Sequence, residues 1–131
     1  MDWTQTYPGL HSMVPAIRAF VRSMLADSPR RDDAESVATE LATNSLRHTP
    51  SGNGGEVAVT VTTGTTKDGT DWARIEVSDA GTGAWTATAA SEWDEYGRGL
   101  AIVERLADKF GHDVADDGQT MWAEVTWTTD E

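Results

Sequence analysis

The sequence predicts an α+β fold, a two-layer sandwich in which helices cover one face of a mixed, mostly antiparallel sheet. Three segments repeat apolar residues at intervals of three and four, and three others alternate apolar with polar residues. Two of the alternating segments follow each other as a hairpin, and the third closes the chain. We find no internal repeat and no long linker, so we expect residues 1–131 to form one domain with a core over about 12–128.

The first helix is predicted over residues 12–26, where Pro15 is tolerated because it falls in the first turn. The segment DSPRRDD ends this helix, and a second helix runs from about Asp33 to His48, where TPSGNGG stops it. A third helix is predicted in GLAIVERLADKFG, with Gly111 as its C-terminal stop. The apolar face of this third helix holds Leu100, Val103, Leu106, Ala107 and Phe110.

The strands are predicted from alternation with a period of two. EVAVTVTT at 56–63 and WARIEVSDA at 72–80 flank a KDG turn signal and form the hairpin. TMWAEVTW at 120–127 is the closing strand, and DWTQTY at 2–7 is a further strand at the edge of the sheet. The segment 81–96 is rich in Gly, Ala and Thr and is predicted to be irregular.

Composition narrows the classes of function. With 22 acidic and 10 basic residues the formal charge is -12, which opposes binding to a nucleic-acid backbone. Solubility explains such acidity more often than a functional surface does, although the charge would also favour a basic protein partner. No apolar run approaches the ~20 residues that span a bilayer, and the N-terminus lacks the apolar core of a signal peptide. The chain has no cysteine, so disulfides and thiolate zinc sites are excluded. We expect a cytoplasmic protein that binds neither nucleic acid nor membrane.

Glu40, Asn44 and His48 lie four residues apart in the second predicted helix, so they form one strip. The strip borders the face that carries Val37 and Leu41, where a carboxylate is costly unless it has a function. A solvated helix border with a hydrogen-bonded histidine explains the same pattern. The helix by itself leaves both interpretations open.

Asp79 is the second unusual residue. Counting by twos from Ile75 through Val77 places its carboxylate at the end of an apolar, core-facing row, where it needs a hydrogen-bond donor. Gly81 and Gly83 follow, and they permit a flat or bulky group to approach the backbone closely. A strand-ending aspartate in an Asx-turn is the alternative interpretation.

Gly97, Arg98 and Gly99 open the third predicted helix. Free backbone N–H groups and the positive end of the helix dipole make such a start suitable for anions, and Arg98 adds a full positive charge. The chain contains no Walker loop and no G-x-G-x-x-G after a strand. This helix start is therefore a candidate phosphate site of another kind.

The order of these motifs resembles the GHKL or Bergerat ATP-binding fold of gyrase and histidine kinases. E-x-x-x-N on a helix, D-x-G-x-G after a strand and G-x-G-L opening a helix occur in that order, before a closing strand. Within that family, ELATNSLRH, VSDAGTG, GRGLAIVERLAD and MWAEV resemble the small stand-alone anti-sigma-factor serine kinases of bacteria. The resemblance extends from about Val14 to Trp127.

The resemblance implies roles for individual residues. Asn44 matches the family's magnesium-binding asparagine, Glu40 its general base, and Asp79 its acceptor for the adenine amino group. Arg47 and His48 are further candidates for phosphate contact, with a surface arginine and a hydrogen-bonded histidine as alternatives. The other nucleotide-binding residues that it implies are Gly81, Gly83, Gly97, Arg98, Gly99 and Leu100.

The resemblance further implies an Mg-ATP-dependent serine/threonine-protein kinase. Such a protein sequesters a sigma factor and phosphorylates a serine on an anti-sigma-factor antagonist, and a homodimer is compatible with it. The segment AWTATAASEWDEY, which corresponds to the ATP lid, has no basic residue, and Arg98 is the only cation between Arg74 and Arg105. Because phosphoryl transfer depends on charge stabilisation, a non-catalytic nucleotide-binding interaction module of the same fold is the alternative.

Overall fold

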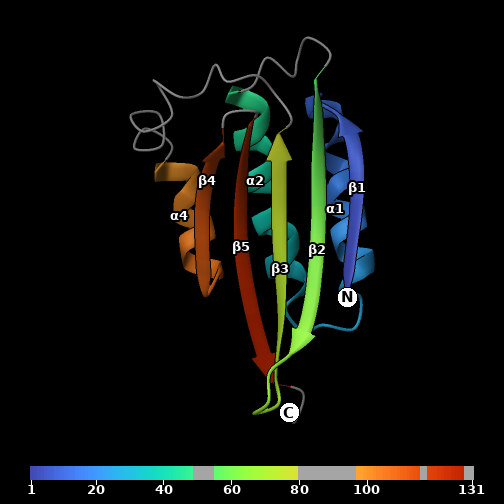
Figure 1. The fold of residues 1–131 in the computed structure, drawn as a ribbon, viewed down its shortest axis with the longest axis vertical. Coiled ribbons are helices and arrows are strands. Elements are labelled where there is room, and N and C mark those ends of the chain that lie inside the picture. Colours follow the sequence, from blue (N-terminus) through green and yellow to red (C-terminus); the bar gives the residue numbers. More distant parts are fainter. Residues whose placement is uncertain (49–54, 80–96, 116–117, 129–131) are drawn as a thin grey trace.

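The computed structural model describes residues 1–48, 55–79, 97–115 and 118–128, without the side chains of 47–48, 97–100 and 114–115. Within these residues, five strands form one sheet in the order β1-β2-β3-β5-β4, and each neighbouring pair is antiparallel. The described helices lie against one face of the sheet (Figure 1), which confirms the predicted α+β two-layer fold. The elements are β1 (Asp2–Pro8), a 3₁₀ turn (His11–Met13), α1 (Val14–Met24), α2 (Arg31–His48), β2 (Glu56–Thr65), β3 (Thr70–Asp79), α4 (Gly97–Leu106), β4 (Lys109–Ala115) and β5 (Gly118–Thr128).

Strand alternation determines which side chains face the helices. On β2, Val57, Val59 and Val61 are fully buried, whereas the residues between them are partly exposed. The predicted hairpin and the predicted edge strand are both present, since β2 pairs with β3 and β1 pairs with β2. On the central strands the buried residues of the same layer are Ala73, Ile75 and Val77 on β3 and Met121, Ala123 and Val125 on β5.

The two N-terminal helices bury one apolar stripe each against this layer. Ile17 and Val21 of α1 and Val37 and Leu41 of α2 are at most 1% exposed. Burying a side chain of this size contributes about 1.5–3 kcal/mol, so the helix–sheet layer is the main source of stability. Among the described residues, no helix combines the length and the hydropathy needed to cross a membrane.

The prediction of one long helix over GLAIVERLADKFG is wrong in its second half. Helix α4 ends at Leu106, and the chain continues as β4, which pairs with β5. Phe110, predicted to lie on a buried helix face, is on this edge strand and is 37% exposed. Gly111, predicted to stop the helix, is a strand residue opposite Trp122.

Contacts with β5 explain why the helix ends early. The Asp108 backbone N–H donates to Glu124 O at 2.8 Å, and the Asp108 carboxylate accepts from the Thr126 N–H at 2.8 Å. The Thr126 hydroxyl donates to the same carboxylate oxygen at 3.0 Å. These partners are distant in sequence, so the local apolar periodicity around Phe110 does not report them.

Candidate functional site

Several element ends meet at one end of the sheet, the upper end in Figure 1. Helix α2 and strand β3 finish there, whereas β5 and α4 begin there. This arrangement brings Asn44, Asp79 and Gln119 to the same end of the molecule, although they are widely separated in sequence. All three polar side chains are buried, with exposures of 2%, 2% and 3%.

Asp79 occupies the position that the alternation predicts. It ends the helix-facing row of β3, and its cross-strand neighbours are Val57 on β2 and Gln119 on β5. Strands on both sides hold its backbone, so the direction of the carboxylate is set by the sheet rather than by a loop. A buried carboxylate in such a row is costly unless it accepts hydrogen bonds. Its fixed position at this end of the sheet makes Asp79 a candidate for ligand recognition.

Asn44 is buried more deeply than the helix-border position predicted for it. Its side chain is 2% exposed, and its Nδ2 has no hydrogen-bond partner among the described residues. An unpaired buried amide costs about 1–3 kcal/mol, which suggests a ligand-dependent role. Glu40 lies one helical turn earlier and is only partly buried.

The remaining predicted residues are described in part or not at all. Gly97 begins α4, so the predicted helix start is confirmed. Gly81 and Gly83 lie outside the described residues, as does the predicted lid. The predicted residues with a described backbone but no described side chain are Arg47, His48, Arg98, Gly99 and Leu100.

Sequence reasoning missed Gln119 and His112. Gln119 is 3% exposed on the helix-facing side of β5, and its Oε1 is hydrogen-bonded to His112 Nε2 on β4. The alternation of β5 contains a signal for Gln119, because counting back by two from Met121 reaches it. His112 had no such signal, since it lies between the segment predicted as helix and the predicted closing strand.

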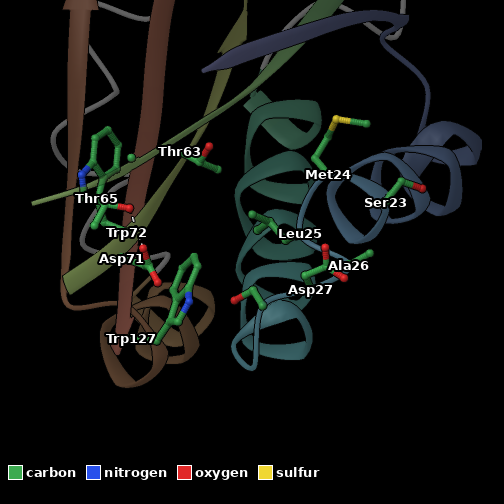
Figure 2. Close-up of a pocket in the computed structure, with 12 residues that line it drawn as sticks. Ser23, Met24, Leu25, Ala26, Asp27, Thr63, Thr65, Asp71, Trp72 and Trp127 are labelled. Atoms are coloured by element: carbon green, nitrogen blue, oxygen red, sulfur yellow. Dashed lines mark hydrogen bonds between the residues drawn. The ribbon is translucent and has the colours of Figure 1, made fainter. Parts of the chain in front are cut away.

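A separate cavity of about 370 Å³ lies at the opposite end of the sheet. Figure 2 shows Asp71 and Trp127 on its sheet side and Leu25, Ala26 and Asp27 on its helix side. None of the predicted nucleotide-binding residues lines it. The cavity is therefore distinct from the polar cluster of Asn44, Asp79 and Gln119.

Comparisons with known proteins agree with this architecture. A family model described as the histidine kinase-like ATPase domain matches residues 8–127. A chain in the crystal structure of the SiaB–SiaC complex from Pseudomonas aeruginosa is similar over 95% of this chain and 89% of that chain. Its TM-score is 0.53 at 14% sequence identity, which shows a shared fold. No curated protein matches the chain.

Proposed function

The chain belongs to the histidine kinase-like ATPase domain family, and from this premise we propose that it is an Mg-ATP-binding regulator of the anti-sigma-factor type. In this proposal it phosphorylates a serine on an antagonist protein and sequesters a sigma factor. The observation that carries the proposal is the burial of Asn44 and Asp79, each 2% exposed, at the same end of the sheet. In this proposal Asp79 accepts a hydrogen bond from the base, and the Asn44 side-chain oxygen would hold the magnesium ion.

Asp79 supplies the recognition of the base in this proposal. An ionised carboxylate only accepts hydrogen bonds, and adenine carries an amino donor where guanine carries a carbonyl oxygen. A carboxylate fixed between β2 and β5 therefore favours adenine, because guanine would bring one acceptor against another.

Asn44 fits the role of a magnesium ligand. The described residues contain no group of three or more His, Cys, Asp or Glu suited to a metal. In this proposal the Asn44 side-chain oxygen would hold the cation together with oxygens of the nucleotide phosphates. This matches the preference of Mg²⁺ for few protein oxygens together with phosphates. Asn44 Nδ2 donates no hydrogen bond to any described residue. Within the described part of the chain, no hydrogen bond of that nitrogen therefore fixes the orientation of the amide. When bound, Mg²⁺ neutralises charge on the phosphates during transfer.

Glu40 is proposed as the general base. It lies one turn before Asn44 on α2, so the two side chains share a strip of the helix. The Glu40 carboxylate takes the proton of the partner's serine hydroxyl as the serine oxygen forms its bond to the γ-phosphorus. The bond from that phosphorus to the bridging oxygen breaks, and ADP leaves.

The partners are proposed from charge and from the likeness to a complex. A formal charge of -12 attracts basic surfaces and speeds their association. The similar solved structure is that of SiaB with SiaC, which supports a protein partner for this chain as well. A nucleotide-binding module without transfer activity is the second candidate, favoured by the absence of basic residues from 84–96.

Calorimetric titration of Mg-ATP tests the nucleotide site. We expect saturable binding to the wild type that is lost in Asp79→Asn and absent with GTP. Asp71→Asn is the matched control, because Asp71 lies on the same face of β3 at its other end and should leave ATP binding unchanged. A wild type that binds no ATP would refute the proposal. Labelled ATP with a cognate antagonist then separates a kinase, which labels the antagonist, from a binding module, which does not.

A further inference from the structure

Gln119 is a buried amide on β5. Its side chain is 3% exposed, and its Nε2 has no hydrogen-bond partner among the described residues. Gln119 and Asp79 are direct cross-strand neighbours, so both side chains stand on the helix-facing side of the sheet. Directly opposed side chains of an antiparallel pair have Cβ atoms about 4.5–5.5 Å apart. The sheet thus places an amide donor next to a carboxylate acceptor.

The contact with His112 determines which atom of the Gln119 amide can bind a ligand. His112 is opposite Met121 in the β4–β5 register, so its ring reaches Gln119 diagonally, two residues along β5. Its Nε2 is hydrogen-bonded to Gln119 Oε1. The oxygen accepts, so His112 Nε2 carries the hydrogen in this arrangement. The amide oxygen is then engaged by His112, and the NH₂ group is available as a donor.

We propose that Gln119, positioned by His112, recognises N1 of the adenine base beside Asp79. This inference rests on the proposed ATP site. Adenine presents a donor, its amino group, next to an acceptor, N1, which is the complement of the Asp79–Gln119 pair. Guanine and hypoxanthine present an acceptor and then an N–H donor, so they mismatch both residues. Asp79 and Gln119 together therefore select adenine at two adjacent atoms rather than one.

The test pairs a ligand change with a residue change. The probe is 1-deaza-ATP, in which N1 is replaced by C–H and the amino group is kept. We expect the wild type to bind ATP roughly tenfold more tightly than 1-deaza-ATP, because the analogue leaves the buried Gln119 donor unpaired. Gln119→Leu should bind both nucleotides with the same affinity. His112→Leu should reduce the preference for ATP, since the amide is then free to rotate.

Thr120→Val is the matched control. Thr120 is the next residue on β5, faces the opposite side of the sheet, and shares a hydrogen bond with Ser78 at 3.0 Å. It should retain the tenfold preference. Thermal unfolding checks that Gln119→Leu is folded, because the substitution also removes the hydrogen bond between Gln119 Oε1 and His112 Nε2.

The outcomes separate this inference from the proposed function. Suppose that the wild type binds ATP and that Asp79→Asn does not. If the wild type then binds 1-deaza-ATP as tightly as ATP, the Gln119 inference is overturned and the ATP site stands. An undiminished ATP preference in Gln119→Leu overturns it as well. If the wild type binds no adenine nucleotide, the proposed function fails, and the inference fails with it.

Discussion

Gly111 on β4 lies directly opposite Trp122 on β5, and a Cβ built on Gly111 would stand 2.6 Å from Trp122 Cζ2. The same relationship occurs in the β2–β3 hairpin, where a Cβ on Gly64 would stand 2.6 Å from Trp72 Cζ2. Each indole therefore covers the glycine opposite it, on the sheet face that points away from the helices. Arg74 lies 4.0 Å from the centroid of the Trp122 ring and holds that indole by a cation–π contact.

The contact between Gly111 and Trp122 leads to a prediction on stability. We expect Gly111→Ala to lower the free energy of unfolding by about 1–3 kcal/mol, because the indole held by Arg74 has to move. In a Trp122→Ala background the same change should be neutral or stabilising, since alanine loses less conformational entropy than glycine in a strand. Chemical denaturation of the four proteins measures the coupling. Equal effects in both backgrounds would contradict the contact.

Arg30, just before α2, joins parts of the chain that are far apart in sequence. Its Nη2 donates to Leu106 O at the end of α4, and its Nη1 donates to Thr126 O on β5 at 2.9 Å. Arg30→Met keeps much of the side-chain volume but removes both donors, so we expect a loss of about 1–3 kcal/mol. Thermal unfolding measures the change.

Arg31→Met is the control for Arg30. Arg31 is the exposed first residue of α2 and donates to Ala26 O, in the connection between α1 and α2, at 3.1 Å. Its replacement should change stability by no more than about 0.5 kcal/mol. If both variants unfold at the same temperature, the linking role of Arg30 is refuted.

Leu41 supports the helix turn that carries Glu40 and Asn44. It is 1% exposed, so Leu41→Ala should cost about 2–5 kcal/mol through lost burial and a residual cavity. Leu10 is 45% exposed, and Leu10→Ala should have a small effect by comparison. Urea denaturation of the two variants compares them directly, and similar losses would show that the helix–sheet layer is not the core.

Glu40→Gln separates binding from transfer. The substitution keeps the size of the side chain but removes the base, so phosphate transfer to an antagonist should fall by about 10²–10⁴-fold. The affinity for Mg-ATP should stay within about twofold, because the proposed nucleotide contacts come from Asn44 and Asp79. Initial rates with labelled ATP and calorimetry measure the two quantities. Glu104→Gln, on the exposed side of α4, is the control and should retain full activity.

Local spacing was sufficient for most of the fold and for part of the candidate site. Apolar residues at every second position identified β2, β3 and β5, and apolar residues three and four apart identified α1 and α2. Burial on one face imposes those periods within a single strand or helix. The same counting placed Asp79 on the helix-facing row, where it is 2% exposed. The motif E-x-x-x-N placed Glu40 and Asn44 on one helix strip.

The sequence by itself thus determined the elements whose apolar pattern is local, the two-layer class and the order of the site motifs. Only the tertiary structure decided that the chain after Leu106 becomes β4, because its hydrogen bonds to Glu124 and Thr126 outweigh a helical apolar pattern. It also decided that Gln119 stands beside Asp79 and is engaged by His112. Strand register joins residues far apart in sequence, and no local period encodes that pairing.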